Sequence, residues 1–224
     1  MTPAGLAQSL RSRRLLIFDL DGTLADTGTA HERAFAEVLD PLGLAFRYAD
    51  IAGMTTEAAL ARIVAANQTQ LDAVVMDDLA RRKRVIAREI LSRDLSPFPG
   101  LVAFLDSVSW ARLAVCSSGS RGTVNQSLRT MALADRFDPV VCGEDVTRGK
   151  PEPEPFLRVL DLAGVTPVDA LIFEDSPSGL ASARAAGIDA IRIDPEAQGV
   201  ALDADALAVC AWPALVRSLK ETVA

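Results

Sequence analysis

Short apolar runs that end abruptly in polar residues recur along the chain. They occupy residues 15–18, 113–116, 140–142, 171–173 and 190–193. A continuous apolar run of this length is typical of a strand buried on both faces, as in a parallel sheet covered by helices. Between the runs, apolar residues recur every three or four positions, which predicts helices at 123–133, 155–163 and 179–186. The alternation predicts a Rossmann-like, doubly wound α/β core.

One long stretch interrupts this alternation directly after the first predicted strand. From about residue 29 to residue 93 the pattern is almost wholly helical. The predicted helices in it lie at 31–39, 56–66 and 71–91. The proline-rich segment 96–100 then returns the chain to the α/β pattern. We therefore expect a core formed by residues 1–27 and 97–224, with a helical cap at 28–96 over the end of the first strand.

Composition and charge narrow the possible partners. Half of the 224 residues are hydrophobic and 24% are charged, the balance of a soluble globular protein. The formal net charge of −7 argues against a nucleic-acid partner, which needs a basic face, but it allows a locally positive site for an anionic substrate. No apolar run approaches the roughly 18 residues that span a bilayer. Residues 1–14 lack the apolar segment of a signal peptide.

These features predict a cytoplasmic protein with no membrane partner. The three cysteines are widely spaced and form no C-x-x-C pattern, which fits a reducing compartment and predicts neither disulfides nor a zinc site. No residue pattern in the chain decides its oligomeric state, and we expect a monomer or a weak homodimer.

Two aspartates follow the first predicted strand directly, in the order Asp19-Leu-Asp21-Gly-Thr. A carboxylate is costly to bring to the end of a buried strand unless a metal ion or another partner compensates its charge. Side chains at i and i+2 leave a strand on the same face, so Asp19 and Asp21 can address one site. The alternative is an ordinary exit from a strand into a turn, because Asp-Gly is a common turn pair.

Three further polar clusters lie where later strands would deliver them into the same crevice. Ser117 and Ser118 offer hydroxyl and backbone N–H groups to a phosphate, unless they only cap the next helix. Lys150 precedes a proline and is either a site residue or an exposed turn lysine. Glu174 and Asp175 end another predicted strand, where two acids suggest a hard cation such as Mg²⁺ and a helix cap is the alternative.

Taken in order, these residues resemble the four motifs of the haloacid-dehalogenase-like superfamily. The motifs are Asp19-x-Asp21-Gly-Thr, Ser117, Lys150-Pro and Glu174-Asp175, and the resemblance spans about residues 14–195. The helical insertion after the first motif is most similar to the beta-phosphoglucomutase-like branch. Each motif alone is common, whereas four in this order at the ends of predicted strands form a specific signature.

The resemblance implies a phosphoryl-transfer site with defined roles. Asp19 would be the nucleophile and Asp21 the general acid/base, while Ser117 and Lys150 would bind the transferring phosphoryl group beside Ser118. A leaving alkoxide needs a proton, so we expect the surroundings to hold Asp21 protonated near neutral pH.

The resemblance also implies a magnesium cofactor. Asp19, the backbone carbonyl of Asp21, and Asp175 would hold Mg²⁺, with Glu174 bound directly or through water. The ion and Lys150 would offset the repulsion between a carboxylate nucleophile and a phosphate dianion.

Three cap residues are candidates for substrate binding. In the branch that the chain resembles, a histidine at the position of His31 touches the acid/base when the cap closes; the alternative is a surface histidine. Lys83 would face the substrate, or it would lie on a solvated face with Asp77 and Asp78 one turn earlier. Thr56 stands where the mutase has an arginine that holds a second phosphate, which favours hydrolysis over phosphate migration.

The function we expect is Mg²⁺-dependent hydrolysis of a small phosphomonoester, of the sugar phosphate or phosphoglycolate type, through an aspartyl phosphate on Asp19. A phosphosugar mutase is the first alternative, and a non-catalytic phosphate-binding module is the second. Dehalogenation is not expected, because dehalogenases of this type lack the second aspartate.

Overall fold

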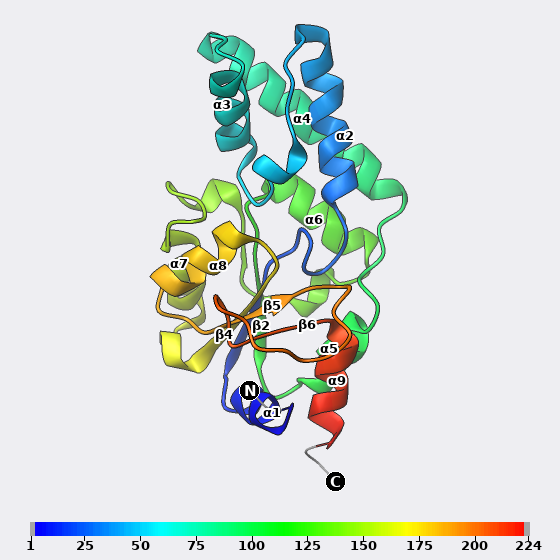
Figure 1. The fold of residues 1–224 in the computed structure, drawn as a ribbon, viewed down its shortest axis with the longest axis vertical. Coiled ribbons are helices and arrows are strands. Elements are labelled where there is room, and N and C mark those ends of the chain that lie inside the picture. Colours follow the sequence, from blue (N-terminus) through cyan, green and yellow to red (C-terminus); the bar gives the residue numbers. More distant parts are fainter. Residues whose placement is uncertain (1–2, 222–224) are drawn as a thin grey trace.

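Six parallel strands form one sheet in the order β3-β2-β1-β4-β5-β6. We describe residues 3–221 of a computed structural model (Figure 1). The strands are β1 (Leu15–Phe18), β2 (Arg112–Cys116), β3 (Val140–Val141), β4 (Ala170–Glu174), β5 (Ala190–Ile193) and β6 (Ala208–Cys210). The chain extends from β1 first toward β3 and then toward β6. The ligand crevice of such a sheet lies at the carboxyl ends of the strands where the direction reverses, which here is the end of β1.

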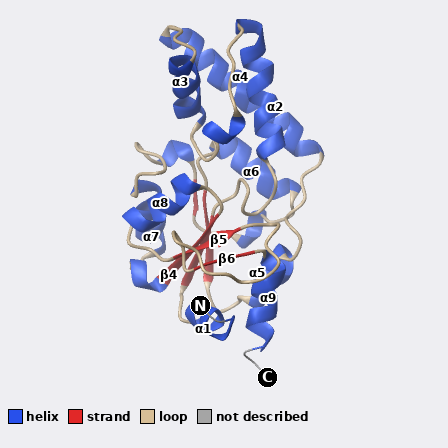
Figure 2. Cartoon of the chain, viewed as in Figure 1, coloured by secondary structure: helices blue, strands red, loops and turns tan. Residues whose placement is uncertain are grey.

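Helices cover both faces of the sheet (Figure 2). One face is covered by α1 (Pro3–Arg11), α5 (Leu101–Ser107), α6 (Arg121–Thr130) and α9 (Trp212–Glu221). The other face is covered by α7 (Glu154–Ala163) and α8 (Pro177–Ala185). Because side chains alternate along a strand, β1 sends Leu16 and Phe18 into the first layer and Leu15 and Ile17 into the second. This burial on both faces is why the run contains no polar residue.

Three helices form a separate layer above the carboxyl ends of the strands (Figure 1). These are α2 (Gly28–Leu39), α3 (Thr56–Ala66) and α4 (Ala73–Arg93), and we call them the cap. They enclose an apolar cluster of their own, whose members all lie between residues 35 and 86. The three helices fall within the predicted 28–96, although these boundaries themselves stay a prediction. Short 3₁₀ helices complete the chain at Asp40–Leu42, Tyr48–Asp50, Ala134–Arg136, Gly143–Asp145 and Pro167–Asp169.

The cap is joined to the core by two adjacent chain segments and by the end of α4. The segment that returns from the cap pairs with the one that leaves, since the Phe98 N–H donates to the Leu24 carbonyl at 2.9 Å. Leu91, near the end of α4, belongs to the apolar cluster of the core. One turn earlier, Arg88 packs so closely over Gly122 of α6 that a Cβ there would lie 2.8 Å from its Nη1. A single helix therefore carries residues of both apolar clusters.

The predicted fold class is confirmed, but four elements were not predicted from the sequence. They are α1, α5, β6 and α9. Two of them are very short, with three residues in β6 and seven in α5, too few for a periodic pattern. The helix predicted at 123–133 was wrong at both ends. Ser120 caps the start of α6 by accepting a hydrogen bond from the Thr123 N–H at 3.4 Å, and the helix ends before Ala132, whose φ is 56°. Within residues 3–221 no helix has the length and apolar character to cross a bilayer.

Candidate active site

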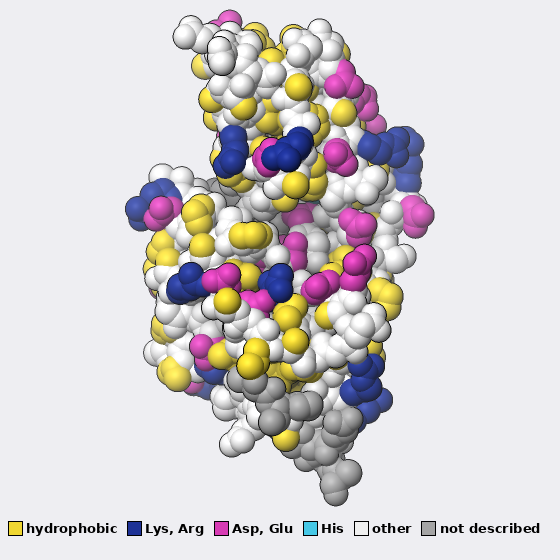
Figure 3. Space-filling view, in the orientation of Figure 1, with side chains coloured by type: hydrophobic (Ala, Val, Ile, Leu, Met, Phe, Trp, Pro, Cys, Tyr) yellow, Lys and Arg dark blue, Asp and Glu magenta, His cyan; other side chains and the backbone are white. Residues whose placement is uncertain are grey.

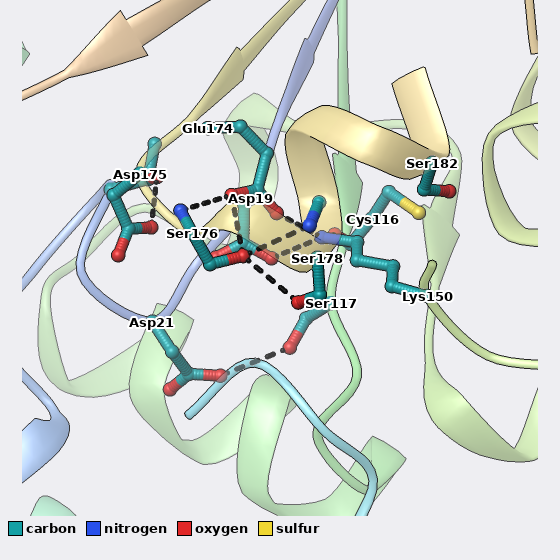
Figure 4. Close-up of polar contacts among 12 residues, drawn as sticks. Asp19, Asp21, Cys116, Ser117, Lys150, Glu174, Asp175, Ser176, Ser178 and Ser182 are labelled. Atoms are coloured by element: carbon teal, nitrogen blue, oxygen red, sulfur yellow. Dashed lines mark hydrogen bonds and ion pairs between the residues drawn. The ribbon is translucent and has the colours of Figure 1, made fainter. Parts of the chain in front are cut away.

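A lysine bridges two buried carboxylates at the carboxyl end of the sheet (Figure 4). Lys150 Nζ lies 2.6 Å from Asp19 Oδ1 and 2.6 Å from Glu174 Oε1, and it donates to the Cys116 carbonyl at 3.1 Å. All three charged side chains are buried. Asp19 follows β1 and Glu174 ends β4, so the pairing of these strands brings the two acids to one lysine.

Burial and crowding govern the protonation of this cluster. Burial raises the pKa of Asp19 well above its usual value, and the attraction of Lys150 offsets only part of this effect. Burial opposes the charged form of Lys150 as well, yet Asp19 and Glu174 hold the pKa of its ammonium well above the usual value. Lys150 therefore stays charged. Its single positive charge is divided between two carboxyl groups, those of Asp19 and Glu174.

Replacing Lys150 with methionine is expected to lower the free energy of unfolding at pH 7 by roughly 3–5 kcal/mol, because two buried carboxylates lose their common partner. The loss should shrink toward pH 5, because the raised pKa of Asp19 allows this carboxyl group to take up a proton as the pH falls. Urea unfolding at both pH values measures it. The control is Arg158→Met, which removes the exposed pair with Asp161 and should change little. Equal losses for both variants would contradict the prediction.

Asp175 lies beside this cluster and is held by the loop after β1. Thr23 Oγ1 donates to Asp175 Oδ1 at 2.8 Å. Gly22, with φ of +87°, lies directly against the same carboxylate, and a Cβ at this position would overlap it. Burial, followed by the repulsion of Glu174, raises the pKa of Asp175 to about 7. The loop with the sequence Asp-Gly-Thr thus positions Asp175, which directly follows β4, the neighbour of β1 in the sheet.

The donor set around Asp19 fits a hard cation. Among residues 3–221 there is no group of three or more His, Cys, Asp or Glu side chains already arranged around a metal position. However, the raised pKa values of Asp19 and Asp175 show two adjacent carboxylates that lack positive charge. Carboxylate and carbonyl oxygens at the end of a strand are ligands of the kind that Mg²⁺ takes.

Asp21 is surrounded by hydrogen-bond donors from both the core and the cap. Its Oδ1 accepts from Thr27 Oγ1 at 2.5 Å and lies 3.1 Å from His31 Nε2, while its Oδ2 accepts from Ser117 Oγ at 3.2 Å. Lys83 Nζ lies 2.9 Å from Nδ1 of the same histidine. Both cap side chains are buried. The cap therefore reaches the core through a chain of contacts from Lys83 through His31 to Asp21.

The expected protonation of Asp21 does not agree with this geometry. Burial acts to raise the pKa of Asp21, but the attraction and hydrogen bond of His31, with the hydrogen bond of Thr27, hold it well below its usual range. In this state Asp21 is a carboxylate, and the prediction that its surroundings keep it protonated was wrong. The sequence offered a contact with His31 as one of two alternatives and gave no sign of the hydrogen bond from Thr27.

The role of Lys83, which contacts Asp21 through His31, can be tested by the pH dependence of activity. Burial lowers the pKa of Lys83 to about 8. Lys83 therefore carries its proton below about pH 8 and loses it above, so kcat/KM for a phosphomonoester is expected to fall as the pH rises through this value. Lys83→Met should lower activity roughly tenfold or more and remove that falling limb. Arg81→Gln, on the exposed face of α4 where Arg81 pairs with Asp78, is the control. A limb that survives in Lys83→Met would contradict the assignment.

A small cavity lies between the cap and the loop that follows β2. Its volume is about 40 Å³, and its lining includes Asp19, Asp21, His31, Thr56, Lys83 and Ser118. Gly119 N–H donates to Ser117 Oγ at 2.9 Å just before α6 begins, so backbone donors and hydroxyls gather at the start of this helix. A cavity of this volume has room for about three water molecules. Figure 3 shows the hollow at the junction of cap and core, with acidic side chains in and beside it.

An outer recess of about 140 Å³ adjoins the cavity. Four residues line both spaces: Thr56, Arg84, Ser118 and Ser120. The recess is bounded further by Glu57 of the cap and Glu144 of the core. The shared residues place the recess next to the cavity that Asp19 lines, on the side of Glu57 and Glu144.

The structure brings the candidate residues from the sequence into one region. Ser118, His31, Thr56 and Lys83 line the cavity with Asp19 and Asp21, while Lys150, Glu174 and Asp175 lie beneath them. Sequence reasoning did not single out Thr27, Ser176, Glu57 or Arg84. Ser176 holds Glu174 Oε2 through its N–H at 2.7 Å and its hydroxyl at 3.0 Å, a role that the sequence Glu-Asp-Ser could have suggested. No local signal marked Thr27 or Arg84, and Glu57 was marked only by its position directly after Thr56.

The sequence and the fold of this chain are similar to those of known proteins. Residues 16–193 match the family of haloacid dehalogenase-like hydrolases. The fructose-1-phosphate phosphatase YqaB of Escherichia coli K12 is 36% identical over 182 residues, which cover 80% of this chain and 95% of that protein. The beta-phosphoglucomutase of Mycobacterium bovis is 30% identical and matches 81% of this chain and 79% of its own. A variant of CbbY from Rhodobacter sphaeroides, solved in complex with xylulose 1,5-bisphosphate, has a TM-score of 0.73 at 26% identity, covering 80% of this chain and 85% of that one. The chain therefore belongs to the haloacid dehalogenase-like hydrolase family, as its four motifs indicate.

Proposed function

We propose that this protein hydrolyses a small phosphomonoester in a Mg²⁺-dependent reaction through an aspartyl phosphate on Asp19. The observation that carries the proposal is the buried Asp19–Lys150 pair beneath a cavity that also contains Asp21. A nucleophile and an acid/base thus line one small cavity, and a fixed positive charge is paired with the nucleophile beneath it. The similarity to the fructose-1-phosphate phosphatase supports the reaction class.

In the first step, Asp19 attacks phosphorus and the bond to the leaving oxygen breaks. Lys150 is held by Asp19 and Glu174 and supplies a charge that needs no rearrangement when the phosphoryl group arrives. Ser117, Ser118 and the N–H groups at the start of α6 would bind the phosphoryl oxygens. In the second step, water attacks the aspartyl phosphate and releases phosphate, so the reaction is divided into two easier displacements.

Asp21 would give a proton to the leaving oxygen in the first step and take one from water in the second. The approach of a phosphate dianion raises the pKa of a neighbouring carboxyl group through like-charge repulsion. The proton would then reach Asp21 from His31, which Lys83 would resupply. This route replaces the permanently protonated Asp21 that the sequence suggested.

Magnesium would be held by Asp19, Asp175 and the backbone carbonyl of Asp21. Both carboxylate oxygens of Glu174 already accept hydrogen bonds, from Lys150 and from Ser176, so Glu174 would act through a water molecule. When bound, the ion would neutralise negative charge between Asp19 and the phosphoryl group.

A phosphosugar mutase is the second candidate, favoured by the 30% identity to a beta-phosphoglucomutase. A mutase must retain a bisphosphate intermediate while it turns over in the site. Thr56 offers one hydroxyl at the cavity wall, where an arginine would bind a second phosphate with charge. Hydrolysis is therefore the leading proposal.

Phosphate release from a panel of sugar phosphates and phosphoglycolate, with Mg²⁺ and with EDTA, tests the proposal. We expect release that EDTA abolishes and added Mg²⁺ restores. Conversion of beta-glucose 1-phosphate to glucose 6-phosphate with little free phosphate would instead establish the mutase. Binding of phosphate without turnover of any compound would leave only the non-catalytic module.

A further inference from the structure

An ion pair between two cap residues lines the outer recess. Arg84 of α4 pairs with Glu57 in the first turn of α3. Arg84 lines both the inner cavity and the outer recess, and 29% of its side chain is exposed. A substrate that reaches from Asp19 toward solvent passes this guanidinium. Left unpaired, it would bind a second phosphate or a carboxylate, since guanidinium groups match both.

Glu57 neutralises that guanidinium. Its Oε1 accepts a hydrogen bond from Arg84 Nη1. Both residues belong to the cap, and their helices contribute to the same apolar cluster. The ion pair therefore does not depend on contacts with the core. Glu144 adds a second carboxylate on the core side of the recess. Two carboxylates and one guanidinium leave a surface that repels an additional negative group.

Apart from Glu57, Arg84 and Glu144, the polar side chains that line the recess are hydroxyls. Thr56, Ser118 and Ser120 line both spaces, Thr123 lines the inner cavity and Thr55 lines the recess. Hydroxyls donate and accept hydrogen bonds without charge, and they suit a partner that is itself rich in hydroxyl groups. The lining thus matches a sugar or polyol better than a second anion.

We propose that the outer recess selects phosphomonoesters whose other end is neutral and hydroxylated, with Glu57 as the residue that excludes a second anionic group. The inference rests on the phosphatase activity proposed above and narrows its substrates. Monophosphates of sugars or polyols are accepted, whereas phosphoglycolate and sugar bisphosphates are poor substrates.

Fructose 1-phosphate and fructose 1,6-bisphosphate form a matched pair, because they differ by one phosphate. We expect the wild-type kcat/KM to be at least tenfold higher for the monophosphate. Glu57→Gln frees Arg84, and the ratio should fall about tenfold through a lower KM for the bisphosphate, the scale of one charge-assisted hydrogen bond. The double variant Glu57→Gln/Arg84→Gln should lose that gain, because the freed guanidinium is absent.

The control is Asp78→Asn, which removes a carboxylate from another Arg pair of the cap outside the recess and should leave the ratio unchanged. Hydrolysis of p-nitrophenyl phosphate, which has no sugar end, reports the chemistry separately. Suppose that the wild-type enzyme cleaves p-nitrophenyl phosphate. A preference for the bisphosphate, no activity on either sugar phosphate, or an unchanged ratio in Glu57→Gln would then overturn the inference alone. A wild-type enzyme inactive on all three compounds overturns the phosphatase itself and the inference with it.

Discussion

Asp19→Asn is expected to lower phosphate release by roughly 10⁴-fold or more, because an amide cannot form the aspartyl phosphate. Asparagine keeps the size of the side chain and one oxygen to accept the hydrogen bond from Lys150. The variant should therefore fold, which thermal unfolding monitored by circular dichroism would show. Steady-state phosphate release with the best substrate of the wild-type enzyme measures the loss.

A covalent phosphoryl group provides the decisive second measurement. Wild-type protein quenched in acid during turnover should carry one phosphoryl group on the peptide that contains Asp19, and Asp19→Asn should carry none. Phosphate attached to another residue, or an Asp19→Asn variant within tenfold of wild type, would contradict the proposed mechanism.

Asp21→Asn should affect two kinds of substrate differently. For a sugar phosphate, the loss of the general acid should cost about 10²–10⁴-fold in kcat/KM. For p-nitrophenyl phosphate the leaving group departs without a proton, so phosphorylation of Asp19 should be nearly intact. Hydrolysis of the aspartyl phosphate still needs Asp21 as a base. We therefore expect a burst of nitrophenolate, equal to the enzyme concentration, followed by slow turnover in a stopped-flow experiment.

The matched control is Thr27→Val, which removes one hydrogen bond to Asp21 Oδ1 but keeps the carboxyl group. It should show no burst, because both steps retain their acid/base. Equal losses for both substrates in Asp21→Asn, without a burst, would show that Asp21 positions the substrate and transfers no proton.

The core of the site was predictable because its signals are local. Asp19, Ser117 and Glu174 each end an apolar run, and a parallel sheet brings the ends of its strands to one edge. Lys150 required the additional information of the family motifs, since a lysine in a proline-rich turn is commonly exposed. The structure buries it because two acids converge on its ammonium.

The part of the site that the cap supplies was only partly predictable. His31 and Lys83 were candidates that could also have been surface residues, and their burial depends on how α2 and α4 pack over β1. The ion pair of Glu57 with Arg84 joins two helices across a turn, and no spacing rule identifies such a contact. The protonation of Asp21 depends on its contacts with His31 and Thr27, which explains why the prediction of a protonated Asp21 was wrong.

The position of β1 at the centre of the sheet has a consequence for how the chain is made. Leu15–Phe18 is synthesised before either of its neighbours, which begin only at Arg112 and Ala170. The cap closes its apolar cluster from residues between 35 and 86, contacts of short sequence separation that form fast. An unpaired apolar strand is open to pairing with other chains until its own partners arrive. The cap can thus fold before the sheet during synthesis. The strand that precedes Asp19 stays unpaired at least until Arg112–Cys116 has been made.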